Sequence, residues 1–383
     1  MERVTYDLPS CWSWVPLGKV ATLLNGRAYK QAELLESGPT PVLRVGNFFS
    51  NRSWYYSDLK LPEDKYCDEG DLLYAWSASF GPKIWEGPRA IYHYHIWKIL
   101  TSPEIDKKFL FYLLEKDSED IKSQGNGVGM FHATKGGMEK MSVPLPPVSE
   151  QKRIIEKLDA LFNRIDTAIE HLQESVALSD ALYASYVDKL LKPSETEDGF
   201  NSTSFLNSTW EWKSIEDVFS ITSGKNLTQK DMIHEGIYPV YGGNGITGRH
   251  NDFNLDGINI IIGRVGALCG NVRLISEKIW VTDNAFFVKE YKVEISKEFL
   301  AKVLDALNLG ATANKAAQPV ISYKGIKDLS IPCPPLEEQE EIVKKLNILS
   351  EKQKDNRELL LGKIGRLRLL RKSILDSAFR GEL

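Results

Sequence analysis

Basic and amide side chains gather in the glycine-rich and aromatic stretches of both halves of this sequence. Guanidinium and ammonium groups bind phosphates and guanine edges, and a side-chain amide can bond adenine at two points. Each such residue, taken singly, is more often a solvated surface residue. The candidates for nucleic-acid contacts are Arg27, Lys30, Arg44, Asn47, Arg52, Lys83 and Lys135 in the first half, and Lys225, Asn226, Lys230, Asn244, Arg249, Arg264, Lys315 and Lys324 in the second.

Motifs for catalysis are missing from the chain. The segment Gly243–Gly248 fits G-x-G-x-x-G, but no helix-forming pattern follows it, so we expect a loop that brings its backbone close to a surface or ligand. Neither a G-x-S-x-G elbow nor a phosphate-binding G-x-x-x-x-G-K-[ST] loop is present. The Pro-Pro pairs follow Leu145 and Cys333, so they do not form the Asn/Asp-Pro-Pro-aromatic motif of amino-methyltransferases. We therefore expect a chain that is not an enzyme and has no catalytic residues.

Histidines and cysteines predict no metal site. His93 and His95 could place two imidazoles on one face of a strand, but a third ligand is not in view, so a packed strand is the favoured interpretation. The cysteines are far apart and form no C-x-x-C pair, so we expect reduced, individually buried thiols without disulfides or zinc. They are Cys11, Cys67, Cys269 and Cys333.

Composition places the chain among globular proteins. It has 383 residues, of which 42% are hydrophobic and 26% charged, enough for two or more domains. The net charge of −4 gives no global sign of nucleic-acid binding, so any polyanion site must come from local segregation of charge. No apolar run is long enough to cross a bilayer and the N-terminus resembles no signal peptide, so we expect a cytoplasmic protein.

An internal repeat organises the chain. The stretch from Val143 to Leu161 recurs from Ile331 to Leu349, with its prolines and its Glu-Gln pair unchanged. Further upstream, Trp12-Ser13-Trp14 pairs with Trp210-Glu211-Trp212, and Gly26 pairs with Gly224. The sequence therefore predicts the order globular, helix, globular, helix.

Two long helices follow the repeated proline-rich motifs. We predict a first globular domain over 1–148, a first long helix over 149–192, a second globular domain over 193–335 and a second long helix over 336–383. Apolar residues at spacings of three and four form a heptad seam on the first helix, which also includes Tyr183 and Tyr186, whereas Ser350 to Arg357 in the second helix is polar. The seam residues are Ile155, Leu158, Phe162, Ile165, Ile169 and Leu172, then Leu346, Leu360, Leu367 and Ile374.

Antiparallel pairing of the two helices buries both seams most simply, about an internal pseudo-two-fold repeat. The alternative is that each helix dimerises with another chain. The globular copies contain short β-branched and aromatic runs, with one helix expected near Lys107–Lys116 and one near Lys297–Leu307. The fold class is therefore α+β, with two β-rich domains separated by two long helices that pair as an antiparallel coiled coil.

The repeated motif resembles that of specificity subunits of Type I DNA restriction–modification systems. The resemblance lies in V-P-L-P-P-x-S-E-Q-x-x-I at 143–154, in I-P-C-P-P-x-E-E-Q-x-x-I at 331–342 and in the terminal L-L-R-K-S-I-L-D-S-A-F-R-G-E-L. It implies that 1–148 and 193–335 are target-recognition domains, each reading one half of a bipartite asymmetric site in double-stranded DNA. The helices would set the spacing and dock two adenine-specific methyltransferase subunits, which carry S-adenosylmethionine, and restriction subunits would join them. No cofactor is implied for this chain itself.

The residues independently favour one scaffold that presents two different surfaces, because the helices repeat while the globular copies diverge. The acidic segments Glu63–Asp71 and Glu115–Asp120 would then face away from the phosphates. Two alternatives stay open: an adaptor whose β-rich domains bind carbohydrate or protein, and an enzyme that acts alone. Salt-dependent DNA binding tests the first alternative, and methyl transfer by the isolated chain tests the second.

Overall fold

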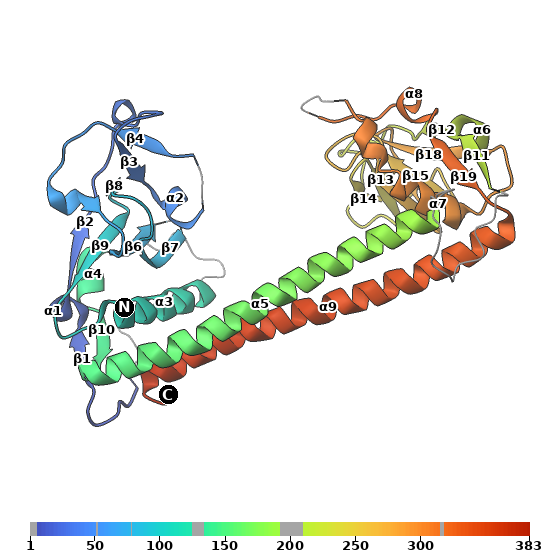
Figure 1. The fold of residues 1–383 in the computed structure, drawn as a ribbon. Coiled ribbons are helices and arrows are strands. Elements are labelled where there is room, and N and C mark those ends of the chain that lie inside the picture. The colour runs from blue at the N-terminus through green and yellow to red at the C-terminus, as the bar shows by residue number, and fades with distance from the viewer. Residues whose placement is uncertain (1–5, 51–52, 78, 125–133, 192–209, 315–317) are drawn as a thin grey trace, which may run out of the picture. The chain divides into compact units, whose positions relative to one another are not determined.

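The computed structural model describes residues 6–50, 53–77, 79–124, 134–191, 210–314 and 318–383 (Figure 1). The chain divides into two compact units. The first unit comprises Met1–Gln173 and Gly362–Leu383, and the second comprises Glu174–Leu361. Each unit contains one globular domain and a part of each long helix.

In the first unit, two four-stranded sheets form the globular domain. One has the order β2-β9-β6-β7 and the other β4-β3-β8-β5, and a third, two-stranded sheet pairs β1 with β10. The strands are β1 (Ser13–Pro16), β2 (Ala21–Asn25), β3 (Thr40–Leu43), β4 (Tyr55–Ser57), β5 (Tyr66–Cys67), β6 (Leu72–Ser77), β7 (Ser79–Ile84), β8 (Ala90–Tyr92), β9 (Ile96–Thr101) and β10 (Ser142–Leu145). The helices are α1 (Leu17–Val20), α2 (Val45–Phe49), α3 (Lys107–Gln124) and α4 (Lys135–Glu139), with short 3-10 turns at Gln31–Glu33 and Glu63–Lys65.

The second unit repeats this plan with fewer strands. Its sheets have the orders β12-β18-β15-β16, β14-β13-β17 and β11-β19. The strands are β11 (Glu211–Ser214), β12 (Phe219–Ser223), β13 (Tyr238–Gly242), β14 (Gly245–His250), β15 (Asn259–Gly263), β16 (Val272–Ile275), β17 (Trp280–Val281), β18 (Ala285–Tyr291) and β19 (Ser330–Cys333). The helices are α6 (Ile215–Val218), α7 (Lys297–Ala306) and α8 (Tyr323–Ile326), with a 3-10 turn at Leu309–Thr312.

Equivalent strands pair in the same way in both units. β3 runs parallel to β8 as β13 does to β17, while β1 and β10 pair antiparallel as β11 and β19 do. The two expected helices are α3 and α7. The α+β fold with an internal repeat, predicted from the sequence, is confirmed.

The long helices are α5 (Val148–Leu191) and α9 (Leu336–Arg380). In the first unit, Leu158 and Phe162 near the start of α5 share a core with Phe379 near the end of α9. In the second unit, Leu190 at the end of α5 shares a core with Leu346 near the start of α9. The helices therefore pair antiparallel within the chain, which overturns the alternative of two separately dimerising helices.

The seam residues differ in burial. Ile155, Leu158, Phe162, Ile165, Leu346 and Leu360 are buried, whereas Ile169, Leu172, Leu367 and Ile374 are half-buried. Tyr186 is exposed and Val187 packs against the second core, so the expected seam position at Tyr186 was wrong. An α-helix has 3.6 residues per turn and drifts off a strict heptad repeat, which moves the buried position by one residue.

A polar segment of α9 faces polar residues of α5. Gln353 donates from Nε2 to Asp180 Oδ1 at 2.6 Å, and Arg357 forms an ion pair with the same carboxylate. Asn356 Nδ2 donates to Ser179 Oγ at 3.2 Å. The polar middle of the second helix is thus matched by polar partners, because unpaired polar groups in the contact would be unfavourable.

The Gln of each repeated motif lies in a long helix and forms hydrogen bonds with the adjoining globular domain. Gln151 is fully buried; its Oε1 accepts from the Asp106 amide at 2.7 Å, and its Nε2 donates to the carbonyls of Glu104 and Pro146. Gln339 Oε1 accepts from the Ser296 amide at 2.7 Å, and its Nε2 donates to the Pro334 carbonyl at 2.8 Å. The repeated Gln therefore makes equivalent hydrogen bonds at both helix junctions.

Two sequence expectations need correction. His93 and His95 lie in the turn between β8 and β9 and not on one face of a strand, because the chain passes there from the sheet that contains β8 to the sheet that contains β9. Cys11 is exposed in a turn before β1, and Cys269 and Cys333 are half-buried, so only Cys67 is a fully buried thiol. Burial raises the pKa of Cys67 to about 12.

Candidate nucleic-acid interface

A polar cleft of about 370 Å³ in the first unit brings two predicted contact residues together. Arg44 and Asn47 line it at the start of α2, with Tyr55, His93 and His95 on the facing segments. The Arg44 guanidinium lies 5.4 Å from the centre of the Tyr55 ring, and Asn47 Nδ2 donates to the Ser53 carbonyl at 3.0 Å. The cleft thus offers a cation and hydrogen-bonding groups beside aromatic rings, a combination suited to nucleic acid.

Beside this cleft, the turn from His93 to His95 packs against Trp76. The Trp76 ring lies 4.9 Å from the His95 ring and 6.0 Å from the Tyr94 ring, and its Nε1 donates to the Tyr94 carbonyl at 2.9 Å. Burial lowers the pKa of His93 to about 4, helped by His95 and Arg44. The His93 imidazole is therefore neutral near pH 7 and keeps one donor and one acceptor nitrogen.

The remaining basic candidates of the first unit are held elsewhere. Arg27 pairs with Glu33 at 2.7 Å and lowers the pKa of that carboxyl, while Lys30 is exposed beside them. Lys83 donates to the Phe48 carbonyl at 3.4 Å, and Lys135 pairs with Glu139 at 3.6 Å. Arg52 lies outside the described residues.

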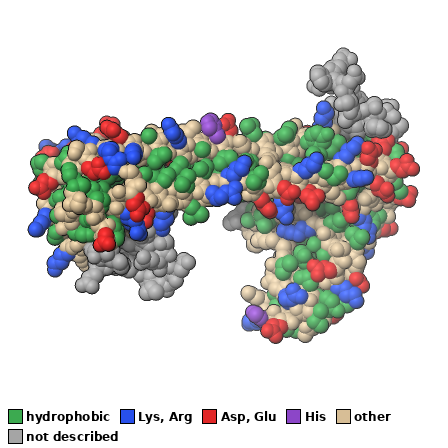
Figure 2. Space-filling view, turned by 90° about the horizontal axis from the view of Figure 1, so that it is seen from below, with side chains coloured by type: hydrophobic (Ala, Val, Ile, Leu, Met, Phe, Trp, Pro, Cys, Tyr) green, Lys and Arg blue, Asp and Glu red, His purple; other side chains and the backbone are tan. Residues whose placement is uncertain are grey.

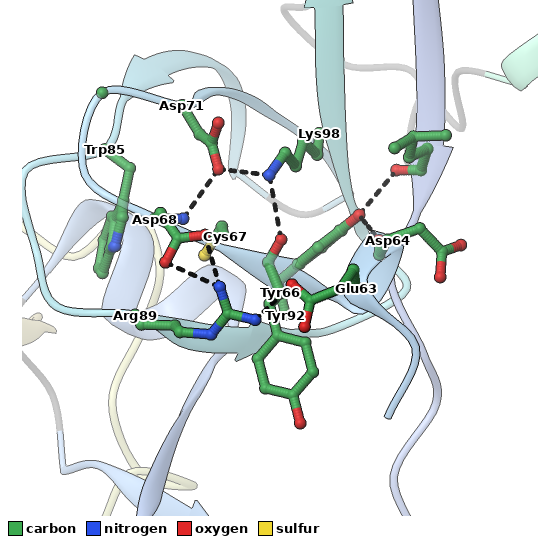
Figure 3. A network of polar contacts seen from close by, with 12 residues as sticks. Glu63, Asp64, Tyr66, Cys67, Asp68, Asp71, Trp85, Arg89, Tyr92 and Lys98 are labelled. Atoms are coloured by element: carbon green, nitrogen blue, oxygen red, sulfur yellow. Dashed lines mark hydrogen bonds and ion pairs between the residues drawn. The ribbon is translucent and has the colours of Figure 1, made fainter. Parts of the chain in front are cut away.

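Carboxylates of the acidic segment Glu63–Asp71 form a network of ion pairs with basic side chains (Figure 3). Arg89 contacts Glu63 at 2.5 Å and Asp68 at 2.9 Å, and Lys98 contacts Asp71 at 2.6 Å. In the other acidic segment, Glu115 pairs with Arg371. These cations reduce the repulsion that the carboxylates would exert on a polyanion.

In the second unit, the β13–β14 turn, which carries Asn244, contacts the segment after β15, which carries Arg264. Asn244 Oδ1 accepts from the Leu268 amide at 3.2 Å, and Arg264 Nη1 donates to the Asp283 carbonyl at 3.1 Å. Arg273 lies behind Gly245, and its buried Nη1 has no hydrogen-bond partner among the described residues. Of the motif glycines, Gly243 lies in the β13–β14 turn, whereas Gly245 and Gly248 lie in β14 and pair with Gly242 and Val240, so the expected loop is a β-hairpin.

Other candidates of the second unit lie on separate segments. Arg249 is bonded to the carbonyls of Gly236 and Ile237, and Lys324 is exposed on α8. Lys225, Asn226 and Lys230 are exposed in the loop after β12. Lys315 lies outside the described residues. Sequence reasoning did not propose Trp76, Tyr94, Asp283 and Asn284, because the offset of 198 between Gly26 and Gly224 does not hold at the two turns, where His93 and Thr282 are 189 positions apart.

Within the described part of the chain, no group of three or more His, Cys, Asp or Glu side chains is arranged to hold a metal ion. None of the helices described there has the length and hydropathy needed to cross a lipid bilayer.

Comparison with known proteins gives consistent matches along the chain. The model of the Type I restriction modification DNA specificity domain matches residues 9–177 and again 207–360. The specificity subunit of the Type I restriction enzyme EcoBI from Escherichia coli is 23% identical over 416 residues, covering 97% of this chain and 86% of the relative. The EcoprrI specificity subunit, also from Escherichia coli, is 25% identical over 350 residues, covering 85% of this chain and 84% of the relative.

Two solved structures share the fold. A chain from a study of complex assembly and conformational transition in the type I R-M system gives a TM-score of 0.75 at 20% identity, covering 99% of this chain and 100% of the other. The HsdS subunit from Thermoanaerobacter tengcongensis gives a TM-score of 0.56 at 20% identity, with 100% of both chains covered. Since the two matched ranges cover most of its length, this chain belongs to the Type I restriction modification DNA specificity family and carries the specificity domain twice.

Proposed function

We propose that this chain selects the DNA target of a Type I restriction–modification complex, with each globular domain reading one half of a bipartite, asymmetric site. The observation that carries the proposal is the pair of equivalent domains with different surface chemistry. The cleft of the first contains Arg44, His93 and His95, whereas the corresponding region of the second contains Asn244, Arg264 and Asp283. Two different surfaces on one repeated frame suit two different half-sites.

Partner subunits supply the chemistry in this proposal. The described residues of this chain bind and orient DNA, and adenine-specific methyltransferase subunits, two per chain, carry S-adenosylmethionine and transfer the methyl group. Restriction subunits join the same complex, which acts in the cytoplasm. The purified chain alone, incubated with S-adenosylmethionine and DNA, is expected to give no adenine methylation, and methylation above a no-protein control would overturn this assignment.

The long helices provide the docking surface for the methyltransferase subunits. Leu178 and Leu182 of α5 are 63% and 69% exposed, and Leu369 of α9 is 69% exposed. Hydrophobic side chains are visible along the helix surface in Figure 2. Exposed leucines on a long helix favour a protein partner that covers them, because exposed apolar side chains are unfavourable in water.

DNA recognition is tested by methylation mapping in cells that express this chain with its partner methyltransferase. We expect methylated adenines within one recurrent bipartite motif, and no such motif when this chain is omitted. In vitro, binding of the complex to a duplex containing that motif should weaken steeply with salt, because phosphate contacts release counterions. Methylation that is independent of this chain, or binding that is insensitive to salt, would contradict the proposal.

A further inference from the structure

Two short turns, one in each unit, share a backbone frame but differ in every side chain. The first corner is His93–His95, between β8 and β9, and the second corner is Thr282–Asn284, between β17 and β18. The first corner follows β8, which runs parallel to β3, and leads into β9, which pairs with β2. The second corner follows β17, which runs parallel to β13, and leads into β18, which pairs with β12. Their equivalence therefore rests on the topology of the two units.

The hydrogen bonds around the corners match one by one. The His93 amide donates to the carbonyl of Leu43, the last residue of β3, at 2.9 Å. The Thr282 amide donates to the carbonyl of Tyr241, the penultimate residue of β13, also at 2.9 Å. Three more main-chain bonds have counterparts. In the first unit, the amides of Arg27, Ile96 and Gly26 donate to the carbonyls of Tyr92, His93 and Ile96, respectively. In the second unit, the amides of Lys225, Ala285 and Gly224 donate to the equivalent carbonyls of Val281, Thr282 and Ala285. These bonds use main-chain atoms, so the frame does not depend on which side chains the corner carries.

Glycine is required beside both corners. A Cβ atom on Gly26 would lie 2.3 Å from the Tyr92 carbonyl oxygen, and one on Gly224 would lie 2.1 Å from the Val281 carbonyl oxygen. Since both distances are far below van der Waals contact, only glycine allows the loop after β2 or β12 to approach the corner this closely. The repeated glycine is thus part of the frame and not a binding residue.

One further residue supports each corner from the neighbouring strand or its end. Trp76 donates from its backbone amide to the His95 carbonyl at 3.0 Å and from Nε1 to the Tyr94 carbonyl at 2.9 Å. Arg264 donates from its amide to the Asn284 carbonyl at 2.9 Å and from Nη1 to the Asp283 carbonyl at 3.1 Å. Trp76 and Arg264 therefore occupy equivalent positions and make equivalent bonds with different chemistry.

We propose that the two corners, each with its supporting residue, are base-reading elements of the two units. This inference rests on the proposed function and names the residues through which it acts. A main-chain frame kept in both copies, with side chains that differ at all three positions, provides a fixed platform for interchangeable contacts. Tyr94 is 39% exposed and Asn284 is exposed, so these side chains are accessible to a ligand.

The side chains of each corner indicate what they read. Asp283 can accept a hydrogen bond from the amino group of cytosine or adenine, Asn284 can bond adenine at two points, and Arg264 can donate to guanine. In the first corner, the aromatic rings of Trp76 and Tyr94 offer apolar contact to a thymine methyl group, and the imidazole of His95 offers hydrogen bonds. The second corner therefore reads amino-bearing base edges, and the first reads an edge with more apolar character.

The test uses matched double variants in the complete complex with its methyltransferase. Y94A/H95A and D283A/N284A remove equivalent side chains while leaving the main-chain bonds of both frames in place. Each should relax one half-site and leave the other unchanged in methylation maps. Discrimination between the cognate duplex and one with a single substitution in the affected half-site should fall by about fivefold to a hundredfold, the contribution of a specific base contact.

Two controls separate this inference from the proposed function. K19A and K289A remove exposed lysines from the first and second units, outside the corners, and should leave both half-sites unchanged. If the unaltered complex methylates no bipartite motif, the proposed function fails. If it does, and both double variants keep both half-sites at full stringency, the corners are not reading elements.

An isosteric variant covers the case of a double variant that does not fold. Asp283→Asn keeps the size of the side chain but replaces a pure acceptor with an amide, so we expect a changed base preference at one position of the second half-site. Identical preference for Asp283→Asn and the unaltered protein at every position would overturn the assignment of Asp283.

Discussion

Each unit bonds to a long helix through an equivalent glutamine, Gln151 in the first unit and Gln339 in the second, but the packing around the long helices differs between the units. In the first unit, α3 contacts both helices: Tyr112 and Lys108 bond Asp159 of α5, and Lys116 pairs with Asp376 of α9 at 3.1 Å. Arg371 of α9 lies 4.2 Å from the centre of the Phe162 ring. This junction is filled by aromatic and charged side chains that bond to one another.

In the second unit, the shorter helix α7 leaves open space beside α9. Cavities of about 450 and 350 Å³ share Glu298 and Asn347 in their linings. Lys302 and Asp305 line the second of them, and burial raises the pKa of Asp305. The comparison shows that the hydrogen-bonded frame is repeated while the packing around it has diverged, so the two junctions should respond differently to the same kind of mutation.

The largest loss in the free energy of unfolding should come from replacing Gln151 or Gln339. Gln151→Leu leaves the Asp106 amide and the carbonyls of Glu104 and Pro146 without their partner, and should cost about 2–5 kcal/mol in the free energy of unfolding. Gln339→Leu removes two such bonds, next to a more open junction, and should cost less. Urea denaturation followed by tryptophan fluorescence measures both changes.

The matched controls for these variants are Lys152→Leu and Glu340→Leu, which change the exposed neighbours of each glutamine. Both should alter stability by less than about 0.5 kcal/mol. If Gln339→Leu proves as costly as Gln151→Leu, the two junctions are equivalent in energy despite their different packing.

A smaller effect is expected at Arg371. Its side chain is 23% exposed, pairs with Glu115 at 3.3 Å and covers the Phe162 ring, so Arg371→Met should destabilise the first unit by roughly 1–2 kcal/mol. Arg366→Met, on an exposed position of α9, is the control and should be near neutral. Equal unfolding midpoints for the two variants would show that the filled junction adds nothing to stability.

The smallest effect concerns pH. The pKa of His93 is lowered from 6.5 to about 4 in the folded protein, mainly by burial, so the unfolded chain binds this proton first as the pH falls. Stability should therefore be unaffected by His93 above pH 6.5 and should decrease as the pH falls from 6.5 towards 4. Thr282 holds the equivalent position in the second unit and does not titrate.

His93→Gln should flatten this part of the stability curve. Thermal unfolding of the variant and the unaltered chain at pH 7.0, 5.5 and 4.5 measures the difference, which should grow as the pH is lowered. A constant difference across the three pH values would mean that His93 does not contribute to the acid sensitivity of the first unit.

The sequence allowed the frame to be predicted better than the surface. The proline-rich motifs with Gln151 and Gln339 indicated both long helices, because apolar periodicity and helix-stopping prolines are local signals. Arg44 and Asn47 were expected in a loop, whereas Arg44 directly precedes α2 and Asn47 lies within it, and their common cleft with His93 depends on strand pairing between distant segments.

The corners were missed for a related reason. His93 and His95 were interpreted as part of a packed strand, and Asp283 and Asn284 were not proposed, since neither group has a recognisable motif. Their equivalence depends on main-chain bonds to Leu43 and Tyr241, far away in the sequence. Non-local pairing of this kind leaves little trace in residue type or spacing.

The central claim is that the two domains read separate half-sites on one repeated frame. The most direct test replaces residues 211–333 with a second copy of residues 13–145, so that both β1–β10 and β11–β19 positions carry the first domain, and maps methylated adenines in cells with the partner methyltransferase. We expect a motif made of two copies of the half-site read by the first unit, with the other half-site lost. A motif that still contains the half-site of the deleted domain would contradict the claim.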